Sequence, residues 1–229
     1  AAALALSGCD ILDDASQGNF RNVLASAEEL TRATQRFFLS PTSMAKEFTE
    51  ADIGKNFRAN GSTSPDDPEY LRLAANGFAD WKLKVGGLVE TPLELSLADL
   101  RAMPSRTQIT RHDCVEGWSC IGKWTGVQLA LVLDEAKLKP EAKYILFTCA
   151  DELEKTLDGS GRYYESHGLE DAFHPQTILA YEMNRVERQL GYKQPKYIMR
   201  IDAVDSREKF GSGNGGFWED RGYEWYAGI

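Results

Sequence analysis

The feature that most limits the fold of this 229-residue chain is the shortness of its patterned segments, in which strand-like and helix-like runs interleave. Alternating apolar residues at Trp81, Leu83 and Val85 predict a strand, followed by a tight turn at Gly86 and Gly87. Further strands are expected over 107–114, 143–150 and 198–202. One helix is expected after Ser96, which caps it, and before Pro104, and another over 126–138. These elements lack the regular alternation of parallel α/β proteins. The sequence therefore predicts an α+β fold with mixed β-sheets and short helices.

The charge of the chain argues against a general nucleic-acid-binding role. It has 35 Asp and Glu residues against 26 Lys and Arg, giving a formal charge of −9. Binding to a phosphate backbone needs a basic face. Any anionic ligand must instead be held by local basic residues that work against the overall field. The sequence has no run of 18 apolar residues, so it predicts no complete transmembrane helix.

The first nine residues, AAALALSGC, are small and apolar, and Asp10 then opens a polar stretch. They resemble the end of a bacterial lipoprotein signal, in which the cysteine is lipidated and becomes the mature N-terminus. The alternative is the start of an Ala- and Leu-rich helix. The signal interpretation predicts a periplasmic protein anchored to the membrane through Cys9. Residues 10–50 are then expected to form an N-terminal helical arm and residues 51–229 the main domain.

The stretch RHDCVEGWSC, residues 111–120, holds Cys114 and Cys120 beside Arg111 and His112. Structural zinc needs four Cys or His ligands, commonly in close pairs, and this chain has no such pattern. The Cys-x-x-Cys motif of thioredoxin-like proteins is also absent. A cysteine nucleophile with His112 or His174 as its base stays possible. So does a single thiolate on a redox metal whose cofactor supplies the other sulfurs.

The longer segment RHDCVEGWSCIGKWTGV resembles the cysteine loop of molybdopterin-dependent oxidoreductases of the sulfite oxidase superfamily. The resemblance is closest to the bacterial branch that includes the periplasmic methionine sulfoxide reductase catalytic subunit. That branch has Arg-x-x-Cys-x-Glu-x-Trp-Ser and then Trp-Thr-Gly, matched here by Arg111, Cys114, Glu116, Trp118, Ser119, Trp124, Thr125 and Gly126. Further blocks follow in the family's order: NFRANG, WKLKVGGLVETPLELSLADLRAMP, YYESHGLEDAFHPQTILAYEMN, RQLGYKQPKYIMRI and GYEWYAGI. The chain is therefore identified as a member of this superfamily, with a sulfite-oxidase-type molybdopterin-binding fold expected over residues 51–229.

The resemblance implies a molybdenum–molybdopterin cofactor (Mo-MPT), whose metal is held by two dithiolene sulfurs and by one cysteine. By position that cysteine is Cys114. Arg111 and His112 are implied to lie near the oxygen-exchange site, where a cation favours an anionic substrate; the alternative for Arg111 is a structural ion pair with Asp113. The residues implied to bind the pterin are Arg58, Ala59, Asn60, Cys149, Lys193, Gln194, Pro195 and Lys196. For Cys149 the alternative is a buried strand residue, and for the two lysines it is solvated surface charge.

The implied activity is a two-electron oxygen-atom transfer on a small S- or N-oxide or a sulfite-like substrate. The sequence has no haem-attachment motif, so a separate electron-transfer partner is expected, either a cytochrome or a haem membrane subunit. Two alternatives stay open: a non-catalytic envelope lipoprotein that retains the fold, and a cysteine hydrolase that uses Cys114 and His112. The chain departs from the family between Asn184 and Arg185, where relatives have a longer stretch with a phosphate-binding arginine.

The signal interpretation is tested by mass spectrometry of the mature native protein. We expect a lipid on Cys9 at the new N-terminus, because the preceding LSG is of the small, apolar kind that precedes such cysteines. Replacing Cys9 by Ser should release the protein from the membrane fraction, whereas Cys120→Ser should leave it there. A mature N-terminus elsewhere, without lipid, would contradict the interpretation.

Overall fold

The computed structural model describes residues 30, 34, 43–55, 62–114, 117–153, 161–183 and 194–223. The chain divides into two compact units, and the larger comprises Met44–Trp225. In the smaller unit, Leu30 and Thr34 are helical, and the Thr34 hydroxyl donates to the Leu30 carbonyl at 2.7 Å. Residues 43–49 have no regular secondary structure and precede a 3-10 turn, η1 (Glu50–Asp52). Within the described part of the chain, no helix combines the length and apolar character needed to cross a membrane.

A five-stranded mixed sheet is formed by β1 (Lys82–Gly87), β2 (Leu93–Ser96), β5 (Tyr144–Glu152), β6 (Arg162–Gly168) and β8 (Ile198–Val204). The order of its strands is β2-β1-β8-β5-β6. β1 runs parallel to β8, and the other neighbouring pairs are antiparallel. The expected α+β fold with mixed sheets is confirmed.

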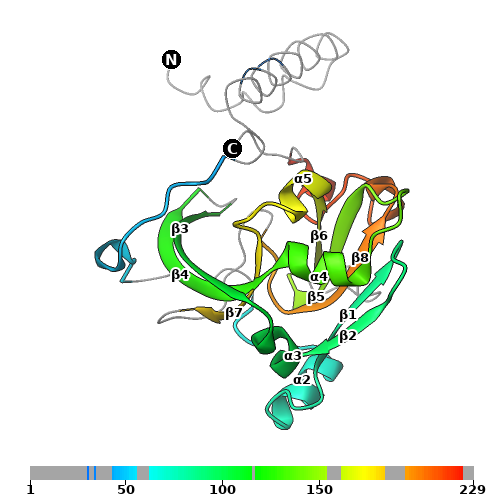
Figure 1. Ribbon diagram of the computed structural model, residues 1–229, viewed down its shortest axis with the longest axis horizontal. Coiled ribbons are helices and arrows are strands. Elements are labelled where there is room, and N and C mark those ends of the chain that lie inside the picture. Colours follow the sequence, from blue (N-terminus) through cyan, green and yellow to red (C-terminus); the bar gives the residue numbers. More distant parts are fainter. Residues whose placement is uncertain are drawn as a thin grey trace, which may run out of the picture. The chain divides into compact units, whose positions relative to one another are not determined.

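A second sheet is antiparallel and has the order β3-β4-β7, with β3 (Ser105–Asp113), β4 (Ser119–Gln128) and β7 (Ile178–Met183). β3 and β4 pair over their length, from Ser105 opposite Val127 to Asp113 opposite Ser119, and form a long curved hairpin (Figure 1). The expected strand over 107–114 is thus confirmed. β4 was not expected, because two glycines interrupt the apolar alternation along it. The hairpin brings the cysteine stretch to its closing turn.

Short helices connect the strands: α2 (Pro68–Ala75), α3 (Leu97–Ala102), α4 (Leu129–Ala136) and α5 (Leu169–Ala172), with 3-10 turns η2 (Arg207–Lys209) and η3 (Glu219–Arg221). α3 begins as the sequence predicts, because the Ser96 side chain accepts from the Asp99 N–H and the Asp99 carboxylate accepts from the Ser96 N–H. The helix expected over 126–138 starts only at Leu129. The three residues before it belong to β4 and pair with β7.

The main core lies between α4 and the five-stranded sheet. Leu129, Val132 and Leu133 of α4 are buried in one cluster with Ile145 of β5 and Ile201 of β8. β4 runs directly into α4, so the end of the hairpin is fixed by this core. A smaller buried cluster joins Cys149 of β5 to Tyr163 of β6 and to Phe217.

The tight turn expected at Gly86 and Gly87 is wrong. Both residues belong to β1 and pair in parallel with Asp202 and Ala203 of β8. The connection to β2 instead runs over residues 88–92. Gly87 has a φ of 74°, and a Cβ there would lie 2.3 Å from the Ala203 carbonyl oxygen. Glycine is therefore required here by the close approach of a neighbouring strand.

Gly126 offers a direct test of how closely β4 and β7 pack. A Cβ on Gly126 would lie 2.2 Å from the Leu179 carbonyl oxygen, so Gly126→Ala should lower the free energy of unfolding by about 1–3 kcal/mol. The measurement is the midpoint of urea unfolding. Gly77→Ala is the control, because its Cβ would meet nothing within 4 Å and only its φ of 66° is unfavourable. A smaller loss for Gly126→Ala than for Gly77→Ala would show that the strands are farther apart.

Candidate functional site

Cys114 lies in the turn that closes the β3–β4 hairpin. Its N–H donates to the Trp118 carbonyl and its carbonyl accepts from the Gly117 N–H, both at 2.9 Å. Gly117 has a φ of 82°, which a residue with a side chain rarely adopts. The Cys114 residue is only 7% exposed. The sequence thus places a buried thiol in a turn whose backbone is fixed by two hydrogen bonds.

Asp113 ties the two strands together beside this turn. Its carboxylate pairs with Arg111 at 3.0 Å and also accepts from the Ser119 hydroxyl. The Arg111 side chain is largely exposed. The alternative expected for Arg111, a structural ion pair with Asp113, is therefore present. A role for Arg111 near the oxygen-exchange site stays a prediction.

His112 points to the opposite face of β3 and is fully buried. Its ring stacks on Trp118 at 5.7 Å between centroids and on Trp124 at 5.9 Å, with interplanar angles of 28° and 26°. The imidazole thus stacks on two indoles, one from the cysteine turn and one from β4. Its catalytic role stays a prediction, and its contacts with these rings are what the structure shows.

A second group of polar residues surrounds Lys196, just before β8. The Lys196 ammonium donates to the Ser62 carbonyl at 2.5 Å and lies 3.4 Å from the Asp151 carboxylate. Asp151 also accepts from the Ser62 hydroxyl at 2.6 Å. Both charged side chains are buried, with exposed fractions of 4% and 0%. Lys196 is therefore not a solvated surface lysine, because its charge is held inside the protein by a paired carboxylate.

Cys149 lies on β5 beside this charged pair, opposite Ile198 of β8. Burial raises the pKa of its thiol well above the usual 9.0; the negative charges of Asp151 and Glu165 raise it further, and Lys196 opposes them. Burial also raises the pKa of the Cys120 thiol. At neutral pH both thiols are therefore protonated. Among the described residues, no group of three or more His, Cys, Asp and Glu side chains could hold a metal ion.

The remaining predicted pterin-binding residues are only partly within the described ranges. Arg58, Ala59, Asn60 and Lys193 lie outside them, and Gln194 is exposed. The structure describes the residues on either side of the predicted turn at 56–61, and they bond to β4 and to the Lys196 group. On one side, the Gly54 N–H donates to the Ile121 carbonyl of β4 at 2.9 Å. On the other side, Ser62 contacts the Asp151–Lys196 pair.

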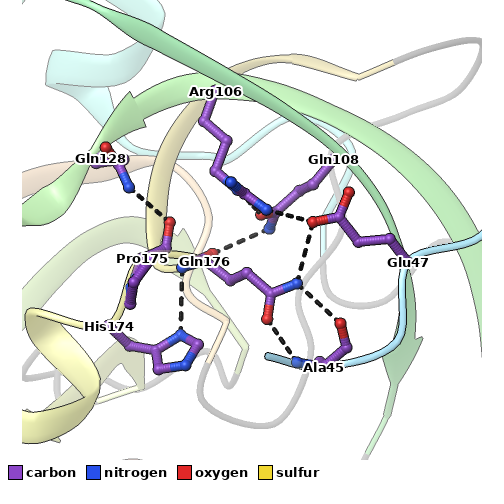
Figure 2. Close-up of polar contacts among 8 residues, drawn as sticks. All are labelled: Ala45, Glu47, Arg106, Gln108, Gln128, His174, Pro175 and Gln176. Atoms are coloured by element: carbon purple, nitrogen blue, oxygen red, sulfur yellow. Dashed lines mark hydrogen bonds and ion pairs between the residues drawn. The ribbon is translucent and has the colours of Figure 1, made fainter. Parts of the chain in front are cut away.

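Ala45 and Glu47, in the segment before this turn, bond to Arg106 of β3 and to Gln176 in the loop before β7. Figure 2 shows the Gln176 side-chain amide bonded to both backbone groups of Ala45 and to Glu47. Arg106 pairs with the same Glu47 carboxylate and donates to the Gln108 side chain. His174, the other candidate base, accepts from the Gln176 N–H at 3.2 Å and so takes part in the local turn.

Sequence reasoning missed Ser62, Asp151 and the pair of indoles around His112. Asp151 could have been found, because it lies two residues after Cys149 and therefore on the same face of an apolar strand. A carboxylate on such a strand needs a buried partner. The contact with Ser62 joins residues 89 positions apart, and no local pattern indicates it.

Comparison with known proteins assigns the chain to a family. Residues 71–187 match the family described as "Oxidoreductase molybdopterin binding domain". The "Putative protein-methionine-sulfoxide reductase subunit YedZ1" of Azospira oryzae is 33% identical over 97% of this chain and 81% of its own length. The MsrP catalytic subunit of Campylobacter jejuni is 29% identical over 75% of this chain and 66% of its own length. That of Xanthomonas axonopodis is 30% identical, over 78% and 54%.

Among solved structures, the sulfane dehydrogenase SoxCD of Paracoccus pantotrophus matches with a TM-score of 0.46 and 21% identity, covering 56% of this chain and 39% of that one. The family match covers more than half of the chain, and the Azospira relative is aligned over nearly all of it. The expectation drawn from the cysteine stretch and the blocks around it is thereby confirmed. The chain belongs to the molybdopterin-binding oxidoreductases of the sulfite oxidase superfamily and is a molybdopterin-dependent oxidoreductase.

Proposed function

We propose that this protein is an exported enzyme that binds Mo-MPT through Cys114 and reduces a small sulfoxide or related S- or N-oxide. The observation that carries the proposal is the Cys114 turn. A thiol that is 7% exposed is held there by two backbone hydrogen bonds at the end of a long hairpin. Cys120 and Cys149 lie within strands β4 and β5, away from the position that the sequence motif gives to the metal ligand.

The donor groups present fit the cofactor. Molybdenum in a redox role suits a soft sulfur donor, and Cys114 offers one in a site largely closed to water. The pterin ends in a phosphate, which needs a cation and backbone N–H donors. Lys196 supplies a buried ammonium in a protein whose net charge is −9. The pairing with Asp151 already orients the ammonium, so the lysine side chain would lose little conformational freedom when the phosphate binds.

The remaining contacts to the pterin are assigned by position to residues on three segments. One is the turn at 56–61 and another is β5 at Cys149. The third is the stretch before β8. The residues are Arg58, Ala59, Asn60, Cys149, Lys193, Gln194, Pro195 and Lys196. Support comes from the described flanks, since Ser62 directly joins the end of the first segment to Asp151 and Lys196.

The bound cofactor supplies the two-electron exchange of an oxygen atom with a substrate. For a sulfoxide, the sulfur–oxygen bond is broken, and two electrons and two protons convert the oxygen to water and leave a thioether. The names of the Campylobacter and Xanthomonas relatives support methionine sulfoxide as the substrate class. Arg111, largely exposed beside the turn, would attract polar or anionic groups of the substrate.

The electrons for this reduction come from a separate partner, for which we propose a haem-containing membrane subunit or a cytochrome. The relatives are bacterial and are named as catalytic subunits, which implies other subunits. A lipid on Cys9 would keep the enzyme in the periplasm beside such a membrane partner. The alternatives of a non-catalytic lipoprotein and a cysteine hydrolase are not favoured, because the chain belongs to a family of oxidoreductases.

The role of Lys196 is tested by separating its charge from its place in the fold. Lys196→Met should lower pterin content and also cost about 3–5 kcal/mol of stability, because it leaves the Asp151 carboxylate buried and unpaired. The double variant Lys196→Met/Asp151→Asn should regain much of the stability, since neither residue is then charged, and should still bind little pterin. Pterin is measured by fluorescence after oxidative release. Full pterin content in the double variant would rule out a contact between Lys196 and the phosphate.

The assignment of Cys114 is tested by Cys114→Ser, with Cys120→Ser as the matched control from the same hairpin. Ser is nearly isosteric, so the fold should survive, but a hydroxyl is a hard and weakly acidic ligand. We expect folded protein that retains some pterin but loses the thiolate-to-molybdenum absorption and reduces sulfoxide more than about 100-fold more slowly. Cys120→Ser should keep both signals. Full activity in Cys114→Ser, or inactivity only in Cys120→Ser, would refute the assignment.

A further inference from the structure

The imidazole of His112 joins the cysteine turn to the body of the hairpin. The ring is fully buried, two residues before Cys114. The ring stacks on Trp118, whose backbone carbonyl accepts the hydrogen bond from the Cys114 N–H. It also stacks on Trp124, which lies in the paired region of β4 opposite Gln108. The stack thus connects the far end of the turn to the β-ladder.

The turn needs such a connection. Hairpin ends are prone to local opening, and two backbone hydrogen bonds connect Cys114 to Gly117 and Trp118 within this one. Gly117 adds conformational freedom to it in the unfolded state. On the outer face of the hairpin, Asp113 bonds to Arg111 and Ser119 and so closes the base of the turn. On the inner face, the described structure shows the stack on His112 in the corresponding place.

We propose that His112 is a positioning residue, which fixes the Cys114 thiol by holding Trp118 against Trp124. Stacked aromatic rings stabilise one another through specific geometry in addition to burial. If Trp118 is held, the carbonyl that anchors the Cys114 N–H is held with it. The proposal rests on the proposed function in assigning Cys114 as the metal ligand. In this proposal His112 acts through the shape of its ring, and not as a proton donor or acceptor.

The first test uses metal-free protein, so it does not depend on cofactor loading. Cys114 is alkylated with iodoacetamide, and its rate is measured separately from the other cysteines by peptide mass spectrometry. His112→Ala should raise the Cys114 rate by about tenfold, because the turn opens more often when the stack is lost. His112→Phe should stay within about threefold of wild type, because a flat ring can still stack on both indoles.

The controls address general destabilisation. His167→Ala removes another half-buried ring, one that packs on Phe147 at 4.8 Å, well outside the hairpin. It should lower the melting temperature and leave the Cys114 rate unchanged. Trp124→Leu is the second route to the same result if His112→Ala does not fold. It removes one of the two indoles that stack on His112 and should raise the alkylation rate of Cys114 by less than about tenfold.

The second test uses protein loaded with Mo-MPT. His112→Ala should shift or broaden the thiolate-to-molybdenum absorption, and His112→Phe should preserve it. Three results would overturn the proposal: folded His112→Ala with a wild-type alkylation rate, His112→Phe that behaves like His112→Ala, or His167→Ala that raises the rate equally. If the wild-type protein contains no molybdenum, the proposed function fails, but the alkylation test of the stack still gives an answer.

Discussion

The arrangement of the site depends on the backbone ladder of β4. This strand pairs with β3 along its length and with β7 along its second half, and then continues into α4. Because α4 lies in the main core, the strand cannot shift without moving buried Leu129 and Val132. The close contact of Gly126 with the backbone at Leu179 fixes the same strand from its other side. The turn that carries Cys114 therefore has its position set by the packing of the whole unit.

The three described thiols lie in different surroundings. Burial raises the pKa of the Cys149 thiol, the charges of Asp151 and Glu165 raise it further, and burial also raises the pKa of the half-buried Cys120. Cys114 stands apart because its turn is shaped by backbone hydrogen bonds. The buried Lys196–Asp151 pair joins β5 and the residues before β8 to the segment that begins at Ser62. We propose that its ammonium also contacts the cofactor phosphate, which the overall charge of −9 would otherwise repel.

The sequence predicted the fold class and the capped helix at Ser96, because these follow from local periodicity and capping chemistry. It predicted the family from ordered motifs around Cys114. It failed at Gly86 and Gly87, where parallel pairing with a strand more than 100 residues later decides the conformation. It also missed β4, whose glycines conceal its alternation, and the Ser62–Asp151–Lys196 contacts, which join three distant segments. Local patterns carry no information about such long-range partners.

The proposed function requires the chain to bind one Mo-MPT, with Cys114 as the protein ligand to the metal. The most direct measurement is the molybdenum and pterin content of the full chain purified from a bacterial host that makes the cofactor. We expect about one molybdenum and one pterin per folded chain, in a constant ratio across preparations. Folded protein that contains neither, after expression in a host whose other molybdopterin enzymes are loaded, would contradict it.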